Sequence, residues 1–74
     1  MITPEQCRAA RALLKWSQGG LAEKTDLALS TIKDFEAEMR TPHLSNLAEI
    51  ERIFMVAGIE FTNGDVPGVR WHKR

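Results

Sequence analysis

The sequence predicts an all-α domain of four to five short helices that ends in a short C-terminal β-hairpin or extended tail. Three observations support this fold class. Apolar residues recur every three to four positions through much of residues 4–57, capping residues stand where helices would begin, and the apolar period changes to two after Gly58. The 74 residues make one domain at most. We divide them into a helical domain over residues 1–58 and a C-terminal element over residues 59–74.

The first two helices have distinct starting signals. Thr3, followed by proline and then by Gln6, reads as a capping box with proline at the first helical position. A helix is therefore expected over residues 4–15. Ser17 is a second N-cap and predicts a short helix over residues 18–25.

The next two helices are bounded by breaks in the apolar pattern. A break at residues 26–28 precedes a helix over residues 29–37. The residue before Pro42 is pushed out of helical geometry, which predicts a loop there. A fourth helix is expected over residues 44–57, with Gly58 in the position that follows a helix C-terminus.

The last part of the chain has the features of a small hairpin. Residues 59–62 alternate between apolar and polar side chains, residues 63–64 form an Asn-Gly turn signal, and residues 69–71 are a candidate returning strand. A hairpin alone is marginally stable. We therefore expect its exposed edge or its apolar face to pair with a second subunit through Phe61 and Trp71, giving a homodimer.

Composition and charge narrow the classes of function. Ten basic and ten acidic residues give a net charge of zero, but residues 43–69 hold one basic side chain against four acidic ones. A single cysteine excludes an internal disulfide framework and a cysteine-based zinc site. There is no membrane-spanning run, secretory signal or catalytic motif. We expect a cytoplasmic protein that is not an enzyme, lies on no membrane, and needs no cofactor or metal.

One set of apolar residues indicates how two short helices meet. A small residue allows the helices to cross closely, and a leucine fills the turn between them. Such a pair is a helix-turn-helix, whose second helix can lie in the major groove of DNA. The set consists of Leu21, Ala22, Leu27, Ile32 and Phe35.

Residues 16–24, 30–36 and 40–42 resemble the XRE/Cro-repressor-like helix-turn-helix domains of bacteria and phages. The resemblance covers residue 4 to about residue 57, and residues 57–61 and 67–70 resemble a tail found in one subgroup of small members. It implies a lambda-repressor-like fold and a transcriptional regulator, in particular a repressor, that binds double-stranded DNA as a homodimer.

The resemblance also implies roles for individual residues. The start of the first motif helix would face the DNA backbone, one flank of the recognition helix would face base edges, and the loop after it would contact phosphates. The DNA-binding positions are Gln18, Ala28, Leu29, Ser30, Lys33, Asp34, Arg40 and Thr41. Arg11 and Glu36 would form a partly buried ion pair between the first helix and the recognition helix.

Three residues depart from the family pattern. Asp26 and Glu38 stand where glycine is usual, and Ala28 replaces the usual Ser or Thr cap of the recognition helix. Glu36 and Glu38 add negative charge near the expected DNA face. We therefore predict weaker and more salt-sensitive DNA binding than in a strongly basic relative.

A second function remains open alongside DNA binding. The chain would then be a protein-interaction module that keeps the helix-turn-helix fold and binds a partner protein, as an antitoxin binds a toxin. The neutral net charge, Ala28 and the apolar Leu29 favour this alternative.

Overall fold

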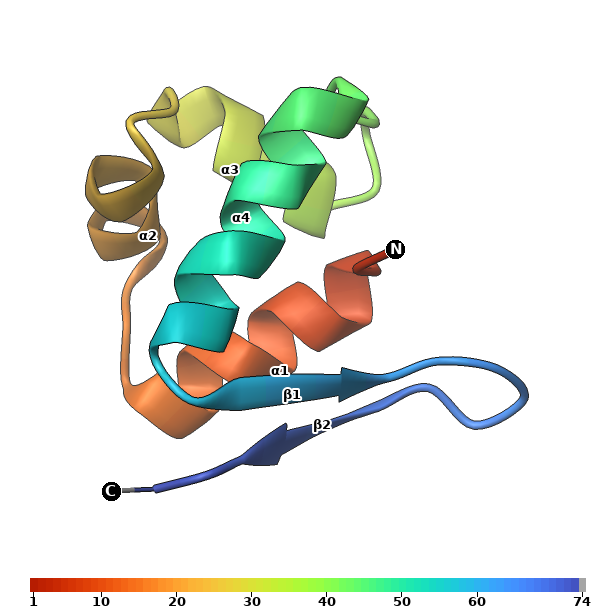
Figure 1. The fold of residues 1–74 in the computed structure, drawn as a ribbon. Coiled ribbons are helices and arrows are strands. Elements are labelled where there is room, and N and C mark those ends of the chain that lie inside the picture. Colours follow the sequence, from red (N-terminus) through yellow and green to blue (C-terminus); the bar gives the residue numbers. More distant parts are fainter. Residues whose placement is uncertain (74) are drawn as a thin grey trace.

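Four helices and a two-stranded hairpin make up the fold of residues 1–73, the part of the chain that the computed structural model describes (Figure 1). This architecture confirms the predicted fold class. The hairpin crosses below the helices at the end of the molecule away from α3 (Figure 1). In chain order the elements are α1 (Pro4–Leu14), α2 (Gln18–Thr25), α3 (Leu29–Glu36), α4 (Leu44–Val56), β1 (Ile59–Thr62) and β2 (Gly68–Trp71).

Side-chain caps fix the starts of α1 and α2. The Thr3 hydroxyl accepts from the Gln6 N–H at 3.1 Å, and the Thr3 N–H donates to the Gln6 side chain at 3.0 Å. The Ser17 hydroxyl accepts from the Gly20 N–H at 2.9 Å. Both helices therefore begin where the sequence predicts.

Three helices end through residues in the left-handed conformation. Lys15, Asp26 and Glu38 have φ values of 60°, 57° and 61°. In each case the next N–H donates to the carbonyl five residues back, at 2.9, 3.1 and 2.8 Å respectively. The turn between α2 and α3 thus forms around Asp26, where relatives of the resembled family usually have glycine.

The core lies between the four helices and extends to the hairpin. Trp16 stacks on Phe54 with ring centroids 5.6 Å apart, and Phe61 of β1 meets Phe54 edge-on at 6.0 Å. Leu27 is partly buried against the core from the turn between α2 and α3. The buried apolar residues are Ile2, Cys7, Ala10, Leu21, Ala22, Ile32, Phe35, Leu47, Ile50, Phe54 and Ile59.

The hairpin is antiparallel, with Ile59 opposite Trp71 and Thr62 opposite Gly68. Its loop contains residues 63–67, so it is longer than a two-residue Asn-Gly turn. Gly58 precedes β1 with a φ of 98°, and a side chain there would meet the His72 carbonyl oxygen at 2.8 Å.

A buried glutamine connects the hairpin to α1. The Gln6 amide donates to the carbonyl oxygens of Thr62 and Gly68, at 2.9 and 3.0 Å. These carbonyls belong to the last residue of β1 and the first of β2, so one side chain holds both strands where the loop leaves them. The oxygen of this side-chain amide accepts the capping hydrogen bond from the Thr3 N–H.

The packing of the hairpin bears on the expected dimer contacts. Its apolar face, which carries Phe61 and Trp71, packs against the molecule's own core, and both residues are partly buried there. This leaves less of that face free for a second subunit than the sequence led us to expect. Beyond the paired strands, the His72 N–H donates to the Gly58 carbonyl at 2.8 Å. Arg74 lies outside the described residues.

Candidate DNA-binding surface

The inner side of α3 is fixed to α1 by an ion pair. The Glu36 carboxylate accepts from Nε and Nη2 of Arg11 at 2.7 and 2.6 Å. The Glu36 side chain is 3% exposed and that of Arg11 is 19% exposed. A forked, two-bond contact of this kind fixes orientation as well as distance, so the pair sets how α3 lies against α1.

Further donors complete the surroundings of Glu36. The Cys7 thiol donates to Oε2 at 3.1 Å and the Gln18 amide donates to Oε1 at 3.1 Å. A guanidinium nitrogen of Arg8 donates to the Glu36 main-chain carbonyl. Arg11 also donates to the Trp16 carbonyl at 3.0 Å. One carboxylate therefore connects α1, the start of α2 and the end of α3.

The protonation states of this cluster follow from burial and hydrogen bonding. Burial opposes ionisation of Glu36, but the bonds from Arg11, Cys7 and Gln18 outweigh it, and the pKa of Glu36 lies below its ordinary value of 4.5. Burial, followed by the bond to Glu36, raises the pKa of the Cys7 thiol far above its ordinary value. The hydrogen bond to Glu36 raises the pKa of Arg11. At neutral pH the cluster is a carboxylate held by a cation and a neutral thiol.

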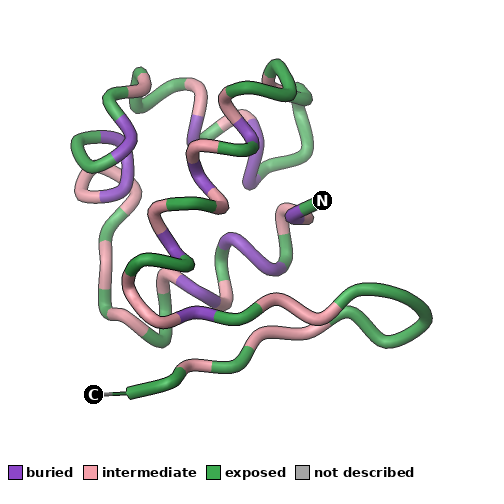
Figure 2. The backbone as a smooth tube through the Cα atoms, in the orientation of Figure 1, coloured by how far each residue is buried: buried purple, intermediate pink, exposed green. Residues whose placement is uncertain are grey.

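The outer side of α3 is open to solvent. Leu29, Ser30 and Lys33 are exposed, whereas Ile32 and Phe35 on the opposite side are buried. Exposed residues continue through the turn before α3 and the loop after it (Figure 2). Leu29 is a large apolar side chain that is 41% exposed at the first position of the helix.

The N-terminus of α3 carries no side-chain cap. Ala28 has the extended backbone of an N-cap, and its methyl group accepts no hydrogen bond. Helical geometry leaves the first N–H groups of any helix without partners inside the helix. At α3 no capping side chain occupies them, and they are polarised toward an anion.

The loop after α3 holds the two expected phosphate ligands, which are both exposed. Arg40 lies 3.8 Å from the Asp34 carboxylate, and the Arg40 side chain is 80% exposed. Thr41 follows in the same loop. A loose, exposed pair of this kind contributes little to stability, so Arg40 can exchange Asp34 for another anion.

The comparison with protein families agrees with this geometry. A family model described as "Helix-turn-helix" matches residues 8–58. The chain belongs to the XRE-like helix-turn-helix family. No curated protein matches the chain.

In this helix-turn-helix domain α2 and α3 are the two motif helices, and the family match supports DNA binding as the general function. Most of the expected contact residues lie on one connected part of the structure: the turn before α3, its outer side and the loop after it. The exception is Gln18, whose side chain is directed to Glu36 at the helix junction. It therefore positions the motif helices in the unbound domain, while its backbone lies at the N-terminus of α2.

Sequence reasoning missed two groups of this helix-turn-helix domain. Cys7, the single cysteine, was used only to exclude a disulfide framework and a cysteine-based zinc site, although it donates to Glu36. Gln6 was interpreted only as a capping residue, although it also binds the hairpin. The signal for Cys7 was its position one turn before Arg11, because residues at this spacing share a helix face.

Residues 1–73 contain neither a membrane-spanning helix nor a metal-binding cluster. No helix there has the length and apolar character that crossing a bilayer requires. No cluster of three or more His, Cys, Asp or Glu side chains there is arranged to hold a metal ion.

Proposed function

We propose that this helix-turn-helix domain is a sequence-specific transcriptional repressor that binds operator DNA as a homodimer. Each subunit places α3 in the major groove of one half-site, with half-sites about 34 Å apart. Occupancy of the operator then excludes polymerase. The protein acts where the DNA is, in the cytoplasm.

The contrast between the two sides of α3 supports this proposal most strongly. The inner side is held by the Glu36 cluster, so the helix keeps a fixed orientation. The outer side presents Ser30 and Lys33 without partners in the described chain. A rigid helix with a free polar flank meets the geometric requirement of major-groove reading.

Each outer residue has a chemistry suited to DNA. Ser30 can hydrogen-bond a base edge, Leu29 can contact a thymine methyl, and Lys33 can reach guanine or a phosphate. Asp34 can accept from a cytosine amino group, but it also repels phosphate and binds Arg40. Breaking the Asp34–Arg40 contact would free Arg40 for phosphate.

The helix ends and the loop supply the contacts that set orientation without reading sequence. The uncapped N-terminus at Ala28 and the backbone at Gln18 present N–H groups toward phosphates. Arg40 and Thr41 extend the same contacts beyond α3. This part of the proposal predicts affinity that falls with salt.

Dimerisation is proposed through a free edge of the hairpin. The core occupies the apolar face, where Phe61 and Trp71 pack. We therefore expect the second subunit to bind backbone groups at the edges of the strands that carry these two residues. A two-stranded hairpin gains stability from further strands, so a second subunit can add to it. Light scattering at about 100 µM tests whether the dimer forms. A monomer at that concentration contradicts the dimer and leaves DNA binding to be judged separately.

Operator selection from random DNA, followed by fluorescence anisotropy at about 50 mM salt, tests DNA binding. The double change Lys33→Glu/Arg40→Glu should weaken binding by more than about tenfold, because it replaces two attractive charges at the interface by repulsive ones. The control Lys15→Glu/Arg52→Glu makes the same change in net charge at exposed positions outside α3, its loop and the hairpin, and should have a much smaller effect. Equal affinities for wild type and the α3 variant would refute the proposed surface.

A further inference from the structure

Arg8 of α1 lies against the end of α3, although it is not part of the helix-turn-helix motif. Its Nη1 donates to the main-chain carbonyl of Glu36, the last residue of α3. This is the one hydrogen bond that Arg8 makes among residues 1–73. It leaves Nε and Nη2 available, the pair of nitrogens with which Arg11 and Arg52 each bind a carboxylate. Arg8 is exposed, so this pair is open to a ligand.

The contact with Glu36 places Arg8 at the end of a row of exposed residues on α3. Leu29, Lys33 and Ala37 are spaced by one helical turn, so they lie along one side of the helix, and all three are exposed. Ala37, the C-cap, contributes only a methyl group there. The Arg8 guanidinium meets the carbonyl of the residue just before Ala37. It therefore adds a cation where the row itself ends without a polar group.

The last turn of α3 is otherwise unfavourable for a phosphate. It carries the carboxylates of Asp34 and Glu36, and its carbonyl groups form the negative end of the helix dipole. Arg40 contacts Asp34, and Arg11 pairs with Glu36. The carbonyl end of the helix is left to Arg8, and a cation at a helix C-terminus is favourable.

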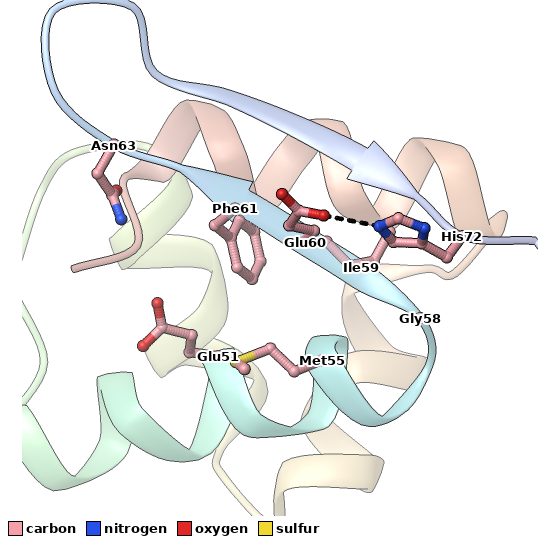
Figure 3. A pocket seen from close by; sticks show the side chains of 8 residues that line it. All are labelled: Glu51, Met55, Gly58, Ile59, Glu60, Phe61, Asn63 and His72. Atoms are coloured by element: carbon pink, nitrogen blue, oxygen red, sulfur yellow. Dashed lines mark hydrogen bonds and ion pairs between the residues drawn. The ribbon is translucent and has the colours of Figure 1, made fainter.

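The groove at the hairpin end of the molecule, between β1 and α4, is also unfavourable for a phosphate. Glu51 and Glu60 are among the residues that line it (Figure 3). The His72 ring beside it is 2.7 Å from Glu60, and Arg52 of α4 is bound to Glu49 at 2.7 Å. The basic groups on this side are thus already paired, and Arg52 provides a control for Arg8.

We propose that Arg8 is a phosphate ligand of this domain, which holds the end of α3 through Nη1 and binds the DNA backbone through Nε and Nη2. The planar guanidinium suits this task because two parallel N–H groups match two phosphate oxygens. A backbone contact of this kind sets the position of the protein without reading sequence. The inference rests on the proposed DNA binding and extends it to a helix outside the motif.

The test measures the affinity of the full chain for a fluorescein-labelled duplex of about 20 base pairs, which carries the sequence selected from random DNA, by anisotropy between about 50 and 300 mM salt. Each phosphate contact steepens the fall of log affinity with log salt concentration by about 0.9. Arg8→Gln should therefore make the slope shallower by about one and weaken binding about tenfold at about 50 mM salt. Arg8→Lys keeps the positive charge and should retain most of the slope.

The controls separate phosphate binding from a purely structural role of Arg8. Arg52→Gln removes the same charge from α4 and should leave the slope unchanged. The Arg8→Gln side chain keeps an amide donor for the Glu36 carbonyl, and a role limited to that bond would change the affinity by the same factor at every salt concentration. Urea denaturation verifies that each variant is folded under the conditions of the assay.

Three results would overturn the inference. The first is a wild-type slope for Arg8→Gln. The second is an equal change of slope in Arg8→Gln and Arg52→Gln, which would show an effect of net charge alone. The third is an equal change in Arg8→Gln and Arg8→Lys, because the positive charge would then not be the binding group. In all three cases binding by the wild type upholds the proposed function, whereas a wild type that binds no duplex would contradict both proposals.

Discussion

The two sides of α3 use charged residues in opposite ways. On the inner side, Glu36 is buried and accepts hydrogen bonds from Arg11, Cys7 and Gln18. On the outer side, Asp34 and Arg40 form an exposed contact of 3.8 Å. The inner charges determine where the helix lies, and the outer charges are free to change partners. Position and binding are thus assigned to different residues of one eight-residue helix.

Removing the buried acceptor should have the largest effect. Glu36→Ala leaves the Arg11 guanidinium without its partner, and breaking a buried ion pair costs about 3–5 kcal/mol. This is a large fraction of the stability of a domain of this size. Urea denaturation monitored by circular dichroism measures the loss.

The exposed Glu49–Arg52 pair provides the control for that change. Arg52→Gln should alter the free energy of unfolding by less than about 1 kcal/mol. A similar loss in both variants would remove the distinction between buried and exposed charges.

Acid should act on the inner side through Glu36. The pKa of Glu36 is lower in the folded than in the unfolded chain, so its contribution to stability is complete above the ordinary value of 4.5. That contribution is lost as the pH falls below 4.5 toward the folded-state pKa. Glu36→Gln should therefore lose less stability than wild type between pH 6 and pH 3, as measured by urea denaturation at each pH. Parallel curves for the two proteins would contradict this prediction.

Neutralising the outer carboxylate should sharpen the contrast. Asp34→Asn removes a charge that repels phosphate and releases Arg40, so binding to non-specific duplex DNA should tighten by up to about fivefold, or 1 kcal/mol. Stability should hardly change. Fluorescence anisotropy at two salt concentrations measures the affinity and its salt dependence. Asp65→Asn, in the hairpin loop, has the same charge change and should have little effect on binding.

The smallest expected effect concerns the turn that follows α3. Glu38 has a φ of 61°, a conformation that costs free energy for residues with a side chain and suits glycine. Glu38→Gly should stabilise the domain by about 0.5 kcal/mol and raise its melting temperature by about 2–4 °C. Ala37→Gly, at a right-handed residue, should be destabilising. A melting temperature lowered by Glu38→Gly would show that the left-handed turn causes no strain.

The sequence was informative wherever a local rule determined the structure. The caps at Thr3 and Ser17, the break at residues 26–28 and the end of α4 before Gly58 each depend on a few neighbouring residues. The Arg11–Glu36 contact came from the family resemblance, because no local rule connects residues 25 positions apart.

Contacts between distant segments were the part that the sequence did not provide. The alternation in residues 59–62 predicted a strand, but it did not show that the apolar side of the hairpin is covered by α1 and α4 rather than by a second subunit. Similarly, the family resemblance assigned Gln18 to a DNA contact. The sequence could not show that its side chain donates to Glu36 instead. Both cases depend on tertiary packing, to which helical and strand periods are insensitive.

The bonds from Gln6 to Thr62 and Gly68 have a consequence for protein synthesis. Gln6 leaves the ribosome first, and the carbonyls that it binds are made 56 and 62 residues later. During translation its amide therefore has neither hairpin carbonyl to bind until Thr62 and Gly68 have been made. The hairpin thus completes the structure around a residue that is made much earlier.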